Sequence, residues 1–250
     1  KANQDILNVY FTAGFPNVNS TAGLIRSLEK AGADIIELGI PFSDPLADGP
    51  TIQQSSERAL ANGMTIDLLF QQLDAIRKDT SIPIIMMGYL NPIMQFGLEK
   101  FVRKAKEVGV DGFIFPDVPT REFEKEWKIL LDEHDLTFSF LVTPQTSEAR
   151  ILYLDSLSSG FLYAVSSSST TGTKEKKNDH EQVKKYLNGL KNLPLKNSVL
   201  AGFGISNRED YQRVNKLVDG AIIGSAFIKY LDKYDDSYST VEDFVKSIKR

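Results

Sequence analysis

The chain contains no cysteine and only two histidines in 250 residues. The lack of cysteine excludes disulfide bonds and thiolate metal sites, and it favours a reducing compartment. The two histidines, His134 and His180, stand in polar surroundings typical of a surface, so a zinc site has no support. We therefore predict no metal site, and any acid–base chemistry must come from other side chains.

The chain also has no excess of basic residues, since it contains 29 Lys and Arg and 33 Asp and Glu, which gives a net charge of −4. This balance excludes the electrostatic footprint that nucleic acids and anionic membranes require. No apolar run approaches the ~20 residues that span a bilayer, and no signal-peptide pattern opens the chain. We expect a cytoplasmic protein with a small-molecule substrate, and no nucleic acid or membrane partner.

Eight short apolar runs recur along the chain, and amphipathic helical patterns, such as those of 66–76, 98–108 and 241–248, lie between them. The runs begin near Leu7, Ala33, Ile82, Asp111, Thr137, Gly160, Asn197 and Asp219. Several are continuous, as in Ile84–Met87, which is typical of strands covered on both faces. The pattern predicts an α/β fold, a single (β/α)8 TIM-barrel domain over residues 1–250. An open doubly wound sheet is the alternative, because periodicity does not show closure.

The second and sixth intervals between strand starts are the longest, which predicts extended loops after strands 2 and 6. The loop after strand 6 begins beyond Val165, and its residues 166–179 are polar with few apolar anchors. It is either a plain solvated loop or a lid over the site. The loop after strand 2 follows Glu37, which ends the apolar run 35–36, and it carries Asp44 and Asp48.

A carboxylate at the mouth of a core strand is costly, so burial should raise the pKa of Glu37 and suit it to acid–base work near neutral pH. No predicted strand contains lysine, which weakens the alternative that Glu37 pairs with a cation and disfavours a Schiff base. Asp48 either joins the chemistry or caps a helix that begins near Pro50. Asp117 is either functional or a turn residue.

Glycines follow the last two predicted strands, at Gly202 and Gly204 and again at Gly224 before Ser225. Loops at these two strands commonly bind phosphate in barrels, although the same glycines could simply form tight turns. Inward residues at strand ends offer a flat, mainly apolar wall. These are Tyr10, Met87, Tyr89, Ile114, Leu141, Tyr163 and Phe203. Together the features favour a substrate with one aromatic and one phosphorylated end.

The run from Glu37 to Gln53, ELGIPFSDPLADGPTIQ, resembles the signature of tryptophan synthase alpha subunits almost unbroken. Further similarity covers nearly the whole length. It includes 11–14, 87–92, 116–119, Tyr163, 171–172, 202–204 and 224–225. The resemblance implies a (β/α)8 lyase of tryptophan biosynthesis. Such enzymes split indole-3-glycerol phosphate into indole and glyceraldehyde 3-phosphate.

The resemblance also implies residue roles. Glu37 matches the acid–base residue and Asp48 the residue that steadies the indole nitrogen. The phosphate binders would be Gly172, Gly204, Gly224 and Ser225. The indole pocket would comprise Tyr10, Met87, Ile114, Leu141, Tyr163 and Phe203. Thr171 would close the loop over the site, although Ser169-Thr170 replaces the usual Gly-Val before it.

The resemblance implies a partner as well, a beta subunit in an alpha2beta2 heterotetramer, which Asp44 and Pro45 would face. That partner carries pyridoxal phosphate (PLP), so this chain would need no cofactor of its own. A regulatory subunit that only activates its partner, a stand-alone indole-glycerol-phosphate lyase, and a barrel for another sugar phosphate remain as alternatives.

Overall fold

A computed structural model describes residues 5–165, 176–202, 204–234 and 238–249 of the chain. Parallel strands form a single sheet in the order β5-β4-β3-β2-β1-β9-β8-β7-β6. Their bounds are β1 Ile6–Thr12, β2 Ile35–Gly39, β3 Ile84–Met87, β4 Gly112–Ile114, β5 Thr137–Phe138, β6 Leu141–Val142, β7 Phe161–Val165, β8 Ser198–Gly202 and β9 Gly220–Ile223. Each predicted strand is therefore present, within two residues of its expected start.

The sheet closes on itself through the segment 137–142. Strand β5 pairs with β4, whereas β6, two residues later, pairs with β7 at the other end of the strand order. The backbone N–H of Ser139 donates to the carbonyl oxygen of Phe113 at 3.0 Å, and that of Tyr163 donates to Phe140 at 2.9 Å. The fifth predicted strand is thus divided in two, because its first half follows one neighbour and its second half the other. Closure confirms the (β/α)8 barrel and rules out the open sheet.

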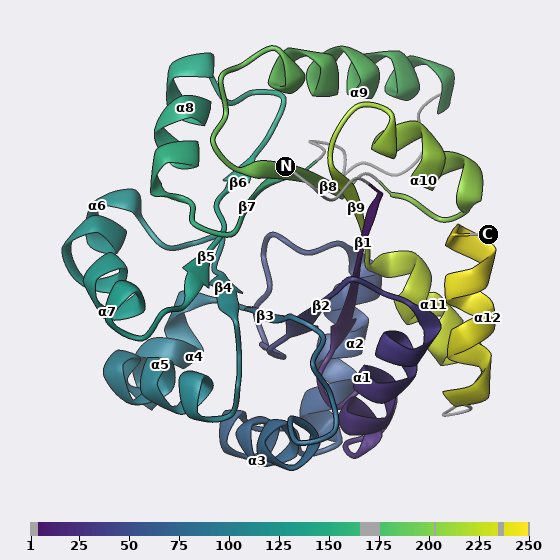
Figure 1. Ribbon diagram of the computed structural model, residues 1–250. Helices are drawn as coiled ribbons and strands as arrows, with labels where there is room; N and C mark the ends of the chain where they lie inside the picture. Colours follow the sequence, from purple (N-terminus) through teal and green to yellow (C-terminus); the bar gives the residue numbers. More distant parts are fainter. Residues whose placement is uncertain (1–4, 166–175, 203, 235–237, 250) are drawn as a thin grey trace.

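Helices surround the strands as an outer ring (Figure 1). They are α1 Ser20–Ala31, α2 Pro50–Ala61, α3 Ile66–Ile76, α4 Leu90–Phe96, α5 Leu98–Glu107, α6 Thr120–Glu122, α7 Lys128–Glu133, α8 Glu148–Leu157, α9 Lys176–Lys191, α10 Arg208–Asn215, α11 Ser225–Tyr234 and α12 Tyr238–Lys249, with a π-helical turn, η1, at Phe123–Trp127. The predicted helical patterns correspond to α3, α5 and α12. The long interval after β2 contains α2 in addition to α3, and part of the interval after β7 lies outside the described residues.

Alternate side chains along each strand pack into two separate hydrophobic clusters. In β1, Leu7, Val9 and Phe11 are fully buried in the larger cluster between the sheet and the helices. A second cluster fills the barrel interior with side chains from five different strands. It consists of Ile85, Ile114, Phe161, Leu200 and Ile222. A buried face on both sides explains why the strands read as continuous apolar runs.

The amino-terminal ends of the strands are fixed by aspartates that precede the next strand. Asp34 accepts a hydrogen bond from the backbone N–H of Leu7 at 2.7 Å. Asp111 does the same for Ile84, and Asp219 for Val199, each at 2.8 Å. A carboxylate that accepts from a strand-end N–H satisfies a donor that the ladder leaves open.

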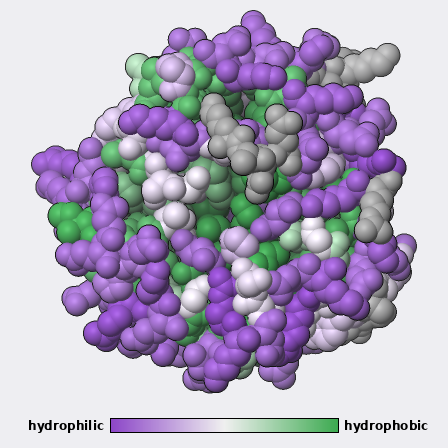
Figure 2. Space-filling model, viewed as in Figure 1, coloured by the Kyte–Doolittle hydropathy of each residue, from purple (hydrophilic) through white to green (hydrophobic). Residues whose placement is uncertain are grey.

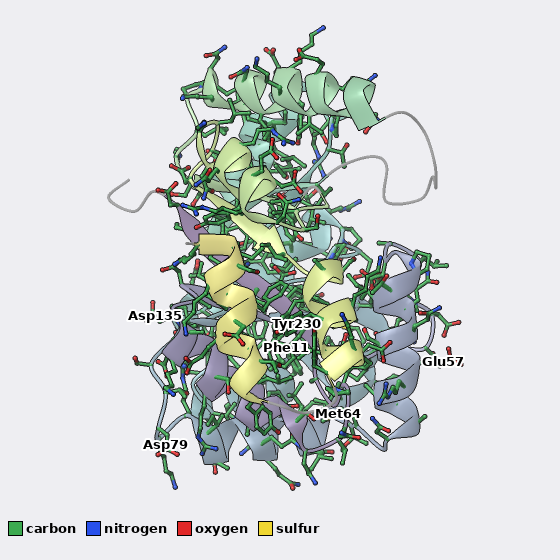
Figure 3. The ribbon with its side chains drawn as sticks, turned by 90° about the vertical axis from the view of Figure 1, so that its right-hand side faces the viewer. Phe11, Glu57, Met64, Asp79, Asp135 and Tyr230 are labelled. Carbon is green, nitrogen blue, oxygen red and sulfur yellow. The ribbon has the colours of Figure 1, made fainter. Side chains whose placement is uncertain are left out.

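The side view identifies the two faces of the barrel. In Figure 3, Asp79 and Asp135, which lie in connections from a helix to the next strand, are on one side, and Glu57 of α2 is on the other. Figures 1 and 2 therefore look onto the amino-terminal ends of the strands. On that face hydrophilic residues cover the outer helices and hydrophobic residues gather around the middle (Figure 2). The carboxyl ends point away from the viewer.

Replacing Asp219 with Ala should lower the free energy of unfolding by about 1–3 kcal/mol, because the backbone N–H of Val199 loses its acceptor. Urea unfolding measures the effect. The control is Asp79→Ala at the same face, which removes an exposed ion pair with Arg26 at 2.8 Å and should cost no more than about 1 kcal/mol. Equal losses in the two variants would contradict the role of Asp219.

Candidate active site

Glu37 lies in β2 with its side chain completely buried. The side-chain amide of Asn8, on the adjacent β1, donates a hydrogen bond to Glu37 Oε2 at 3.1 Å. The second oxygen, Oε1, has no hydrogen-bond partner among the described residues. Burial raises the pKa of Glu37 to about 8, against the lowering effect of Asn8 and with a further rise from the charge of Asp48.

This environment excludes the alternative in which Glu37 pairs with a cation. Its hydrogen-bonding neighbour is a neutral amide, and the charged residue that shifts its pKa is an acid. A carboxyl group with a pKa of about 8 is mainly protonated at neutral pH and ionises readily. It can therefore both give and take a proton.

Asp48 lies in the loop between β2 and α2. Its carboxylate accepts a hydrogen bond from the Tyr89 hydroxyl at 3.0 Å, and burial raises its pKa to about 6 despite that bond. The loop is held by Ala47, whose N–H donates to the Tyr89 oxygen, and by Gln53, whose amide donates to the carbonyl oxygen of Asp48. Gly49, not Asp48, occupies the cap position of α2, so the capping alternative is wrong. Asp48 is ionised at neutral pH beside a mainly protonated Glu37.

Two tyrosines border the acidic pair. Tyr10 is the register partner of Glu37 across β1 and β2, and Tyr163 comes from β7. Burial raises the pKa of both hydroxyls well above the usual value, and the negative charges of Glu37 and Asp48 add to the rise in each. Both phenols therefore stay neutral and remain available as hydrogen-bond donors.

Glycines at the strand ends make room for these rings. A Cβ on Gly39 would stand 2.3 Å from the Tyr10 hydroxyl, and one on Gly202 would stand 2.9 Å from the Tyr163 hydroxyl. The Tyr10 hydroxyl lies 3.4 Å from Thr12 Oγ1, which lies 2.6 Å from Ser55 Oγ of α2. This buried hydroxyl chain links the end of β1 to the helix that follows Asp48.

Four residues of the predicted indole pocket lie together at the interior cluster of the barrel. Ile114 belongs to the interior cluster, and Met87, Leu141 and Tyr163 pack against it as partly buried residues near the carboxyl ends of their strands. Their incomplete burial leaves apolar surface above a filled layer. Phe203 lies outside the described residues, so its predicted place in the wall stays a prediction.

The predicted phosphate residues lie on the other side of β1. Gly204 has φ +61°, in the left-handed region that favours glycine. Register pairing of Val9 with Ile223 sets the following Gly224 beside Tyr10. Ser225 is the first residue of α11 and not its cap, and the first turn of that helix has no acidic residue. The predicted phosphate residue Gly172 and loop residue Thr171 lie outside the described residues.

Asp117 has a structural role. Both of its carboxylate oxygens accept a hydrogen bond from the backbone N–H of Leu90 at the start of α4, at 3.0 and 2.9 Å. The described residues contain no cluster of three or more potential metal ligands. In the same ranges, no helix has both the length and the apolar character needed to cross a membrane.

Sequence reasoning missed Asn8, which contacts Glu37 directly. A signal was present, because Asn8 is the one amide in the apolar run of β1, ILNVYFT, and it lies two residues before Tyr10 on the same inward face. Thr12 and Ser55 were missed as well. Their pairing joins residues 43 positions apart, and no local pattern reveals it.

Comparison with known proteins agrees with this geometry. The family model described as tryptophan synthase alpha chain matches residues 1–249. The tryptophan synthase alpha chain of Flavobacterium johnsoniae is 49% identical over 98% of this chain and 95% of the relative, and that of Christiangramia forsetii is 48% identical over 98% and 94%. The Pyrococcus furiosus tryptophan synthase A-subunit superimposes with a TM-score of 0.87 at 32% identity, covering 98% of both chains. A chain of the P. furiosus tryptophan synthase complex gives a TM-score of 0.88 at 33% identity, with 98% of both chains covered. With its acidic pair at the carboxyl edge of a closed barrel, the chain belongs to the tryptophan synthase alpha chain family.

Proposed function

We propose that the carboxyl edge of this barrel cleaves indole-3-glycerol phosphate into indole and glyceraldehyde 3-phosphate, the lyase step of tryptophan biosynthesis. The observation that carries the proposal is Glu37, fully buried with a pKa of about 8 and electrostatically coupled to Asp48. Buried acids with shifted pKa values are typical of catalytic sites.

The substrate fits the site from two sides. Its phosphate would accept hydrogen bonds from the backbone around Gly204, Gly224 and Ser225, where the amino-terminal end of α11 favours an anion. Its indole ring would lie on the apolar surface of Met87, Ile114, Leu141 and Tyr163, with Tyr10 at the edge nearest the phosphate. The family resemblance implies that Gly172 and Phe203 would complete these two regions and that Thr171 would close over them; all three lie outside the described residues.

The reaction is a reverse aldol with one proton entering and one leaving. Protonated Glu37 gives its proton to the indole carbon that bears the glycerol side chain. Ionised Asp48 accepts a hydrogen bond from the ring N–H and stabilises the positive charge that develops on the ring. The Glu37 carboxylate then removes the proton of the adjacent glycerol hydroxyl. The carbon–carbon bond breaks as indole regains aromaticity, and Glu37 ends protonated again.

Two proton transfers through one carboxyl group require no electron acceptor, so we propose that the chain works without a cofactor of its own. We further propose that residues 1–250 act as one TIM-barrel domain in the cytoplasm, where a chain without cysteine needs no oxidising conditions.

The partner is a tryptophan synthase beta subunit, which holds PLP and joins the released indole to serine. We propose that the loop carrying Asp44 and Pro45 faces it. Leu46, between this pair and the catalytic Asp48, is 89% exposed. A groove of about 370 Å³ lies beside the loop and is lined partly by Phe42, Asp44, Leu60 and Pro92. Leu46 would add to the apolar surface that Phe42, Leu60 and Pro92 give the groove, and an apolar patch bordered by polar residues is a feature of surfaces that bind proteins.

Replacing Glu37 with Gln should abolish detectable indole release, because the amide can neither give nor take the two protons; the loss is at least ~10²-fold. The measurement is indole released from indole-3-glycerol phosphate, with and without beta subunit, and circular dichroism reports the fold. Glu57→Gln, the same change on the exposed surface of α2 (Figure 3), is the matched control. Retained turnover in the Glu37 variant would refute its role, and an inactive unmodified chain that still activates its partner would identify a regulatory subunit.

The dependence of kcat/KM on pH should be bell-shaped. Activity requires Asp48 ionised and Glu37 protonated, so it should rise through a pKa of about 6 and fall through a pKa of about 8. In Asp48→Asn the lower limb should disappear, and the upper limb should remain but move to lower pH, because the negative charge that adds to the rise in the pKa of Glu37 is gone. A profile that rises through about 8 would show that Glu37 enters the reaction as a base, contrary to the proposed order.

A further inference from the structure

Asn8 is an unusual residue for the middle of a core strand. Its neighbours along β1 are apolar, its own side chain is completely buried, and a buried amide is costly unless it is hydrogen-bonded. One bond is present, from Nδ2 to Glu37 Oε2 at 3.1 Å, while Asn8 Oδ1 has no partner among the described residues. The side chain is therefore kept buried with only part of its hydrogen bonding satisfied.

The contact gives the two carboxyl oxygens of Glu37 different surroundings. Oε2 faces an N–H donor, so a proton on that oxygen would meet another hydrogen. Oε1 faces no described partner and is the oxygen on which a proton meets no competing donor. The carboxyl group thus has one oxygen suited to accepting and one suited to carrying a proton.

We propose that Asn8 is a positioning residue that assigns these tasks, so that Oε1 carries the proton exchanged with the substrate and Oε2 remains the acceptor of the Asn8 amide. This inference rests on the proposed lyase function, which gives Glu37 a proton to exchange. It explains why a partly unsatisfied amide is retained where an apolar side chain would be cheaper to bury.

The other titratable groups that act on Glu37 cannot replace this contact. Tyr10 of β1 has its hydroxyl near Thr12, Tyr163 of β7 feels the charge of Glu37, and Asp48 acts on Glu37 through its negative charge. Among the described residues, the hydrogen bond to the carboxyl group therefore comes from Asn8, which stabilises the ionised form.

The first experiment replaces Asn8 with Leu, which has similar size and no donor, and measures kcat/KM against pH. Without the amide the carboxylate is less stable, so the upper limb should move to higher pH by about one unit, the effect of one charge-assisted hydrogen bond. Turnover should fall at least about tenfold through lost orientation. Asn8→Ala also removes the N–H donors, and its upper limb should move in the same direction.

The control is Ser139→Ala, which removes a buried hydroxyl inside the barrel that accepts from the backbone N–H of Phe161 at 3.1 Å. This variant should keep the upper limb of the unmodified chain. An upper limb that stays in place in both Asn8 variants would overturn the inference, because a merely structural role lowers activity without moving it.

A second readout needs no turnover. In the protonated form, Oε2 is the carbonyl oxygen that accepts from Asn8, so the infrared C=O band of Glu37, identified by its loss in Glu37→Gln, should move to higher wavenumber in Asn8→Leu. An unchanged band would contradict the assignment of the two oxygens. An unmodified chain without lyase activity would instead refute the proposed function, while a shifted band would still establish the contact.

Discussion

The structure depends most on the burial of one carboxyl group. Glu37 is placed by β2 at full burial, and desolvation raises its pKa to about 8. This burial lowers the stability of the folded protein. The pKa of Glu37 is higher in the folded state than in the unfolded chain, where it is about 4.5. The folded state therefore becomes less stable as the pH rises above about 4.5. The protein bears that cost at the position where the proposed acid–base chemistry needs it.

The remaining site residues adjust this central group. Asn8 holds one oxygen, Asp48 adds a negative charge, and the neutral Tyr163 lies within electrostatic reach from β7. Strand β1 connects these elements, since it lies between β2 and β9 and contributes both Asn8 and Tyr10. Glu37 of β2 and the candidate phosphate residues that follow β9 are thus separated by a single strand, which suits a substrate with an aromatic end and a phosphorylated end.

Much of this arrangement is predictable from the sequence because it follows local patterns. Continuous apolar runs such as Ile84–Met87 located the strands, and Glu37 at the end of its run already indicated a buried acid. The division of the fifth strand was not predictable, since it follows from closure of the barrel. The Thr12–Ser55 pair was not predictable because its two residues are distant in sequence. Asn8 stands out in its apolar run, but its contact with Glu37, 29 positions away, was not predictable. The helix-cap alternative for Asp48 could be rejected only from the structure, in which Gly49 occupies the cap position of α2 and Asp48 contacts Tyr89.

The central claim is that the Glu37 carboxyl group titrates near neutral pH because it is buried. Carbon-13 NMR of protein labelled at the glutamate side-chain carboxyl carbons measures this directly, with the Glu37 resonance assigned by its absence in Glu37→Gln. The account predicts a resonance that titrates with a pKa of about 8 in the free chain. A Glu37 resonance that titrates near the ordinary value of about 4.5 would contradict it.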